Sequence, residues 1–129
     1  MELKYNKIMI IDDNDIDNYI TSTLIKKNNF TNDLLEFDSG LKAIEYLEKN
    51  KNNDQELPDL ILLDIYMPIM DGFEFLHLFE KIDPAITKKC KICIVSSSID
   101  DNDIFKARLD KNIYTFISKP LTAELLYSL

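Results

Sequence analysis

The sequence is poor in the residues that mark several special classes of protein. Its 129 residues include only 2 glycines, 4 prolines and 2 cysteines. So few glycines and prolines exclude collagen-like and proline-rich disordered chains, and so few cysteines exclude a disulfide scaffold. With 46% hydrophobic and 29% charged residues, the composition is that of a globular protein. The length predicts a single domain with one hydrophobic core.

The sequence also lacks an excess of positive charge and any long apolar run. Its 15 Lys and Arg residues against 23 Asp and Glu residues give a formal net charge of -8, which disfavours contact with nucleic-acid phosphates and anionic lipid head groups. No apolar run approaches the roughly 20 residues that span a bilayer, and residues 1–7 lack the apolar segment of a secretory signal. We therefore expect a cytoplasmic protein that neither inserts into membranes nor binds nucleic acid directly.

The two cysteines, Cys90 and Cys93, have the C-x-x-C spacing of some redox and metal sites. However, they stand at the start of an apolar, strand-like run, and residues three apart on a strand face opposite sides of the sheet. The sequence therefore favours two buried or edge cysteines over a redox or metal pair.

Strands and helices are expected to alternate along the chain. Short apolar runs predict strands, over residues 7–11, 33–37, 60–63, 92–95 and 114–117. Helices are expected between and after them, over residues 15–27, about 41–47, 72–81, 100–110 and 122–129. The polar residues 50–56 predict an exposed loop. This alternation is typical of an α/β fold, with a five-stranded parallel sheet and helices on both faces.

Polar and ionisable groups stand where four of these strands end. Asp12 and Asp13 follow the first strand, Asp64 the third, Ser96 the fourth and Lys119 the fifth. Ligands of an open parallel sheet bind beyond the carboxyl ends of its strands, so we expect these groups to share one site. Clustered carboxylates need a cation, and oxygen ligands suit Mg²⁺, with Mn²⁺ as a substitute. One carboxylate can then attack phosphorus to form an acyl phosphate, while a hydroxyl and an ammonium group hold the other phosphoryl oxygens.

Further motifs lie beside these groups. Met67-Pro68 and Asp71-Gly72 follow Asp64, and Pro120 follows Lys119. With them, the chain resembles the receiver domains of response regulators in two-component signalling, of the stand-alone chemotaxis-regulator type. Each motif is weak alone, but their common order and spacing are specific. The resemblance covers essentially the whole chain and implies one receiver domain over residues 1–129. It also implies a doubly wound, flavodoxin-like sheet with the strand order 2-1-3-4-5.

The resemblance implies a role for each group of the site. Asp64 would receive a phosphoryl group from the phosphohistidine of a sensor histidine kinase or phosphotransfer protein. Asp13, Asp64 and the backbone carbonyl of Tyr66 would bind Mg²⁺ directly, and Asp12 chiefly through water. Lys119 would pair with the phosphoryl group, and the peptide bond between Lys119 and the proline after it would be cis.

The resemblance also implies a conformational switch. Ser96 would move toward the phosphoryl group on activation, and Phe116, in the place of the family's switch aromatic, would turn inward. The helix over 100–110 and the last strand would then change shape and bind a downstream protein partner. Whether two copies of the chain pair is left open.

Some positions depart from the commonest family pattern. Asn112 lies in a loop where Gly is usual, and Asn tolerates the left-handed conformation that such a turn requires. Tyr66 and Ser98 occupy two variable positions that tune the loss of the phosphoryl group. We expect Tyr66 to screen Asp64 from water, which predicts slow self-dephosphorylation.

Two functional classes remain open on sequence alone. A phosphorylation-dependent switch or relay needs the full set of carboxylates, Ser96 and Lys119, and the chain has it. A phosphorylation-independent interaction module on the same fold would be signalled by the loss of Asp13, Asp64 or Lys119, and none is lost. A phosphotransferase of the haloacid-dehalogenase type needs a second Asp two residues after the first, where Tyr66 stands. We therefore expect a signalling switch that catalyses only its own phosphorylation and slow dephosphorylation.

Overall fold

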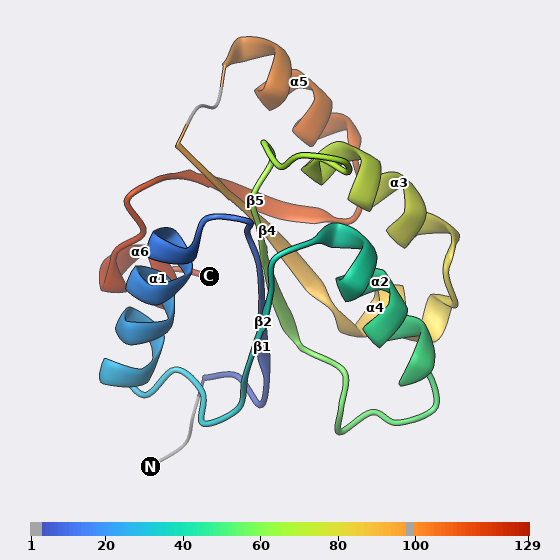
Figure 1. Cartoon of the computed structure of the whole chain (residues 1–129), viewed down its shortest axis with the longest axis horizontal. Helices are drawn as coiled ribbons and strands as arrows, with labels where there is room; N and C mark the ends of the chain where they lie inside the picture. The colour runs from blue at the N-terminus through green and yellow to red at the C-terminus, as the bar shows by residue number, and fades with distance from the viewer. Residues whose placement is uncertain (1–3, 98–99) are drawn as a thin grey trace.

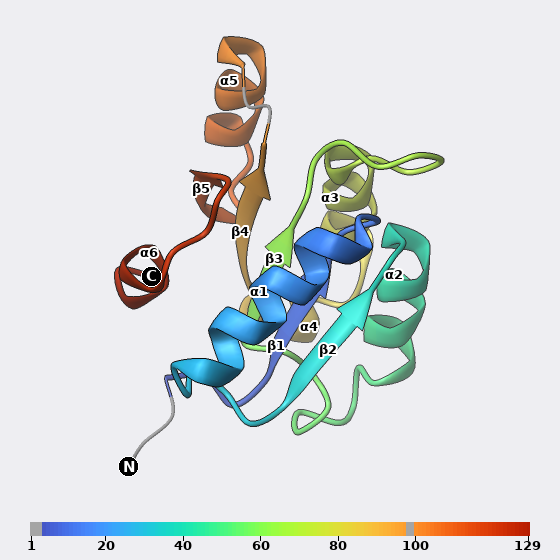
Figure 2. The same ribbon diagram turned by 60° about the vertical axis from the view of Figure 1, so that its left-hand side comes forward.

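Five parallel strands form one sheet in the computed structural model, which describes residues 4–97 and 100–129. The strands are β1 (Ile8–Ile11), β2 (Leu34–Phe37), β3 (Leu60–Leu63), β4 (Lys91–Ser96) and β5 (Ile113–Ser118). Their order across the sheet is β2-β1-β3-β4-β5, and each neighbouring pair is parallel. This is the doubly wound, flavodoxin-like α/β fold that the family resemblance implies. Figure 2 shows the strands with their carboxyl ends toward the same edge of the sheet.

Helices cover both faces of the sheet (Figure 1). They are α1 (Asp15–Lys27), α2 (Gly40–Lys49), α3 (Gly72–Lys81), α4 (Pro84–Lys89), α5 (Asp101–Leu109) and α6 (Ala123–Tyr127). Helices α1 and α6 lie on one face, and α2, α3 and α5 pack on the other. Among the described helices, none is long and apolar enough to cross a membrane.

The hydrophobic core has two layers, one on each face of the sheet, where the sequence predicts a single core. In β1, Met9 and Ile11 belong to the layer under α2 and α3, whereas Ile8 and Ile10 belong to the layer under α1 and α6. All four side chains are buried. A strand that is buried on both faces needs apolar residues at every position, which is why β1 and β3 are continuous apolar runs.

Side-chain caps determine where the helices begin. Asn14 caps α1, because its Oδ1 accepts a hydrogen bond from the backbone N–H of Asp17 at 2.9 Å. Asp100 and Asp103 form a capping box at the start of α5. The sequence places Asp100 inside this helix, but as the N-cap it lies just outside.

Helix α4 was not predicted from the sequence. It follows α3 closely and begins with Pro84, and the carboxylate of Asp83 accepts a hydrogen bond from the N–H of Ala85 at 2.9 Å. A capping residue followed by proline is a typical helix start. With six residues, the helix is too short to show apolar periodicity, and Ile86 is its buried residue.

The turn before β5 differs from the expected left-handed turn. Asn112 is not among the described non-glycine residues with positive φ, which are Asn29 and Ile69. Instead, the carboxylate of Asp110 accepts a hydrogen bond from the N–H of Asn112 at 2.8 Å. A side chain that bonds the backbone two residues on makes a turn without a left-handed residue, so no glycine is needed here.

Cys90 and Cys93 are free, buried thiols. They belong to different layers of the core, one on each side of the sheet. Burial raises the pKa of each thiol to about 12, so both are neutral at pH 7. The prediction that both cysteines are buried or at an edge is confirmed, because both are buried.

Candidate functional site

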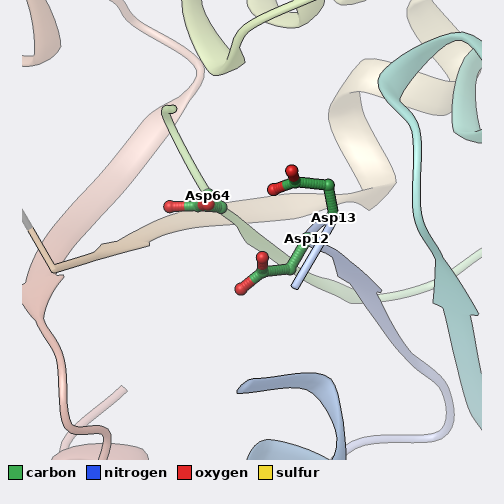
Figure 3. Close-up of side chains that lie close together, drawn as sticks. All are labelled: Asp12, Asp13 and Asp64. Carbon is green, nitrogen blue, oxygen red and sulfur yellow. The ribbon is translucent and has the colours of Figure 1, made fainter. Parts of the chain in front are cut away.

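Three carboxylates meet at the carboxyl edge of the sheet (Figure 3). Asp12 continues the β1 ladder, since its N–H donates to the carbonyl of Phe37 at 3.1 Å, and the N–H of Asp64 donates to the carbonyl of Ile11 at 2.9 Å. One carboxylate oxygen from each of Asp12, Asp13 and Asp64 lies within 4.8 Å of the others. Asp12 and Asp64 are buried, and Asp13 is exposed. The structure therefore brings together the three acids that the sequence predicts.

Both carboxylate oxygens of Asp12 already have partners within the chain. Its Oδ1 accepts a hydrogen bond from the N–H of Asn14 at 2.9 Å, and its Oδ2 accepts one from Nζ of Lys119 at 2.8 Å. The side chain of Asn18 also donates to the backbone carbonyl of Asp12 at 2.7 Å. These contacts hold Asp12 between the first turn of α1 and the segment after β5.

Lys119 contacts three carboxylates, one of which, Asp17, was not predicted as a site residue. Its Nζ lies 2.8 Å from Asp12, 2.8 Å from Asp17 and 3.9 Å from Asp64. Burial lowers the pKa of Lys119, but the hydrogen bonds to Asp12 and Asp17 and the nearby negative charges together raise it by more. The pKa of Lys119 therefore lies above its ordinary value. The ammonium group is therefore charged at neutral pH. The peptide bond between Lys119 and Pro120 is cis, as the resemblance implies.

Asp64 has a raised pKa. Burial is the largest cause and the negative charge of Asp12 the second, while Lys119 and the N–H of Ile65 act in the opposite direction. The pKa of Asp64 is raised to about 6. A bound cation or a closer ammonium group would favour the ionised form of Asp64. Either would therefore lower the pKa of this carboxyl.

Ser96 is the last residue of β4 and is fully buried. Its hydroxyl is near enough to Asp64 to lower the pKa of that carboxyl slightly. Within residues 4–97 and 100–129, however, Oγ meets no partner with hydrogen-bonding geometry. A buried hydroxyl without a partner costs about 1–3 kcal/mol, which makes this group ready to bind an oxygen placed in the site.

Comparison with known proteins identifies the family. The family model of the response regulator receiver domain matches residues 8–129. The chain belongs to this family. Receiver domains are the phosphoacceptor switches of two-component signalling, they bind a divalent metal ion at an acidic pocket, and they pair with histidine kinases or phosphotransfer proteins.

Individual relatives are similar over most of this receiver domain. The sensor histidine kinase CheAY of Helicobacter pylori is 33% identical over 92% of the chain, and the response regulator protein VraR of Staphylococcus saprophyticus is 31% identical over 92%. The chain spans only 14% and 51% of these relatives, respectively. The crystal structure of a two-component response regulator from Cytophaga hutchinsonii superposes with a TM-score of 0.89 and 31% identity, covering 96% of this chain and 92% of that one.

Tyr66, which follows the receiver's Asp64 by two residues, reaches toward α5. Its ring is about half exposed, and its hydroxyl donates to the carboxylate of Asp103, which is buried in the first turn of α5. This hydrogen bond is the largest cause that raises the pKa of Tyr66, to about 12. Phe116 is half-buried and packs against the core layer under α2 and α3. Ser98, the second variable position, lies outside the described residues.

Gly72 allows the segment after β3 to close against Asp64. The N–H of Gly72 donates to the carbonyl of Ile65 at 2.7 Å. A Cβ atom at position 72 would lie 2.6 Å from the backbone oxygen of Asp64 and 2.9 Å from Cα of Ile65, closer than real Cβ atoms approach. The glycine of the Asp71-Gly72 motif is thus required by the backbone that holds the site in place.

Proposed function

We propose that Asp64 is the residue that accepts the phosphoryl group in this receiver domain. The observation that carries this assignment is a buried carboxylate at the sheet edge, grouped with Asp12 and Asp13 and facing Nζ of Lys119 at 3.9 Å. The donor is the phosphohistidine of a sensor histidine kinase or a phosphotransfer protein. A carboxylate oxygen of Asp64 attacks phosphorus, the phosphorus–nitrogen bond breaks, and the imidazole leaves and takes up a proton.

The metal ion of the site is proposed to be Mg²⁺, with Mn²⁺ as a substitute. Carboxylate and carbonyl oxygens are hard ligands, which suit both ions. Asp13, Asp64 and the backbone carbonyl of Tyr66 would bind the ion directly. Asp12 would act through water, and its engagement with Asn14 and Lys119 supports this role. The bound ion would offset the negative charge that gathers between the carboxylates and the phosphoryl oxygens.

The remaining groups would convert phosphorylation into a change of shape. Phosphorylation adds about -1.5 to -2 charge and three acceptor oxygens. Lys119 would pair with these oxygens, Ser96 would turn its hydroxyl toward them, and Phe116 would turn inward. The face made by α5 and β5 would then bind a downstream protein partner or a second copy of the chain.

The proposal extends to three general properties of the protein. Residues 1–129 form one receiver domain, of which residues 8–129 match the family. The domain catalyses its own phosphorylation, and slow self-dephosphorylation follows if Tyr66 screens the phosphoryl group from water. A cytoplasmic location stays a prediction from the sequence.

Phosphorylation by a small donor tests this proposal. Wild type, Asp64→Asn and the control Asp54→Asn are incubated with acetyl phosphate, with Mg²⁺ or with a chelator, and their intact masses are compared. Asp54 is an exposed aspartate in the loop over 50–56, outside the described contacts of the site. We expect one added phosphoryl group in wild type and Asp54→Asn, only with Mg²⁺, and none in Asp64→Asn. A wild type that stays unmodified and binds neither Mg²⁺ nor a phosphoryl mimic would support the phosphorylation-independent interaction module instead.

A further inference from the structure

The resting contacts of Lys119 involve Asp17, which the proposed function does not use. Nζ of Lys119 lies as close to Oδ2 of Asp17 as to Oδ2 of Asp12, at 2.8 Å in each case. Oδ1 of Asp64 is 3.9 Å away, beyond hydrogen-bonding distance. In this state, the ammonium group is bound by two carboxylates on the α1 side of the site and not by the carboxylate that would be phosphorylated.

The first turn of α1 fixes Asp17 in this position. The N–H of Asp17 donates to the capping side chain of Asn14 at 2.9 Å, and the next residue, Asn18, donates to the carbonyl of Asp12 at 2.7 Å. The side chain of Asp17 is 33% exposed and that of Lys119 is 14% exposed. Because this pair is only partly solvated, solvent screens its attraction less than that of a surface pair.

Binding of a phosphoryl group by Lys119 would compete with this pair. An ammonium group has three N–H donors, and Asp12 and Asp17 occupy two of them. Nζ must approach Asp64 before it can bond phosphoryl oxygens there, and such a movement weakens the contact on the α1 side. The negative charge of Asp17 also repels the negatively charged phosphoryl group on Asp64, which disfavours phosphorylation.

We propose that Asp17 is a positioning residue that holds Lys119 in its resting place and competes with the phosphoryl group for its ammonium. This inference rests on the proposed function of Asp64. It implies that the charge of Asp17 lowers the affinity of the site for a phosphoryl group and favours the unphosphorylated state. Removal of that charge frees Lys119 to move toward Asp64.

Asp15 provides a matched control for the removal of this charge. It lies in the same turn of α1, is exposed, and makes no ion pair within the described residues. Asp17→Asn and Asp15→Asn therefore remove equal charge from the same helix end, but only the first alters the partner of Lys119. Asp17→Glu keeps the charge and serves as the conservative variant.

The test measures the affinity of each variant for beryllofluoride, a mimic of the phosphoryl group, at saturating Mg²⁺. We expect Asp17→Asn to bind beryllofluoride about three- to fivefold more tightly than wild type, the effect of one partly exposed ion pair. Asp15→Asn and Asp17→Glu should stay within about twofold of wild type, since neither removes the charge beside Lys119. Thermal melts confirm that each variant is folded.

The ¹⁵N resonance of the Lys119 ammonium gives a second, independent result. In the absence of beryllofluoride, Asp17→Asn should shift this resonance and Asp15→Asn should not. A merely structural role of Asp17 would not produce this difference. Unchanged or weaker binding of beryllofluoride by Asp17→Asn would overturn the inference, as would an unshifted resonance. If wild type itself failed to bind beryllofluoride with Mg²⁺, the proposed function would be wrong, and this inference would fall with it.

Discussion

At the scale of single residues, the raised pKa of Asp64 predicts a pH-dependent stability. Its pKa in the folded chain is about 6, against 3.8 without the surroundings of the site. The folded state therefore binds the proton more tightly than the unfolded state, so the free energy of unfolding falls as the pH rises from about 4 to about 6 and stays lower above that range. Ionised Asp64 thus lowers the stability of the folded state when no metal ion is bound.

Asp64→Asn should remove this loss of stability. In a chelating buffer at pH 8, we expect Asp64→Asn to be more stable than wild type by about 2–3 kcal/mol, and at pH 4 the two should be nearly equal. Thermal or urea unfolding across this pH range measures the difference. Asp54→Asn serves as the control, and saturating Mg²⁺ should reduce the effect. Equal stabilities of wild type and Asp64→Asn at pH 8 would contradict the raised pKa.

Among the described residues the hydroxyl of Ser96 has no hydrogen-bond partner, which predicts opposite effects of its removal in the two states of the domain. Ser96→Ala should leave the resting fold as stable as wild type or up to about 1 kcal/mol more stable, because it removes a buried group that has no partner within residues 4–97 and 100–129. The same change should weaken beryllofluoride binding about tenfold, the effect of one hydrogen bond to a charged group. Ser97→Ala is the matched control, since Ser97 is the exposed neighbour. Weaker beryllofluoride binding by Ser97→Ala but not by Ser96→Ala would show that Ser97, not Ser96, binds the phosphoryl group.

Much of the site was predictable at the residue scale, because its groups follow strand ends. Asp12, Asp13 and Asp64 come together as predicted, and Lys119 faces them. Asp17 was missed because its contact depends on the rotation of a helix relative to a loop 102 residues further along the chain. The acidic first turn of α1 is visible in the sequence, but favourable interaction with the helix dipole explains such residues equally well.

At the scale of structural elements, the hydrogen bond between Tyr66 and Asp103 links the segment after β3 to α5. Tyr66→Phe removes this bond and leaves the ring in place. We expect the amide protons of α5 to exchange faster with solvent in this variant, which hydrogen-exchange mass spectrometry measures. Tyr19→Phe, on the exposed face of α1, is the control. Unchanged exchange over 101–109 in Tyr66→Phe would show that the bond does not hold α5.

Gly72 and Gly40 provide a second comparison between elements, because each is the first residue of its helix. Gly72→Ala places a methyl group against the backbone of Asp64 and Ile65, so we expect a loss of about 1–3 kcal/mol and weaker beryllofluoride binding. A Cβ at Gly40 would meet the flexible side chain of Met70 at 3.0 Å, which can move. Chemical unfolding compares the two variants, and equal losses would argue against the tight backbone contact at Gly72.

The boundaries of the elements show where sequence patterns lose information. The bounds of β3 and α3 agree with prediction, because an apolar run and a capping Asp mark their ends. Strand β4 includes Ser96, which the sequence places after the strand, because the N–H of Lys119 donates to the carbonyl of Ser96 at 2.9 Å. Helix α4 was missed altogether. The first difference depends on a contact between strands that periodicity does not report, and the second arises because a helix of six residues is too short to show periodicity.

At the scale of the whole molecule, the alternation of strands and helices was enough to predict a parallel sheet covered on both faces. The strand order came from the family resemblance, and the structure confirms it. The two-layered core follows from the same architecture, because a central sheet separates the apolar side chains on its two faces. The sheet places β1 and β3 side by side, and this adjacency brings Asp64 to Asp12 and Asp13.

The central claim is that Asp64 carries the phosphoryl group. Trapping the acyl phosphate tests it most directly, because borohydride reduces a phosphorylated aspartate to homoserine, which peptide mass spectrometry locates in the sequence. After treatment with acetyl phosphate and Mg²⁺, the account predicts homoserine at position 64 and none when Mg²⁺ is omitted. Homoserine at position 12 or 13, or a phosphorylated protein with none at position 64, would contradict it.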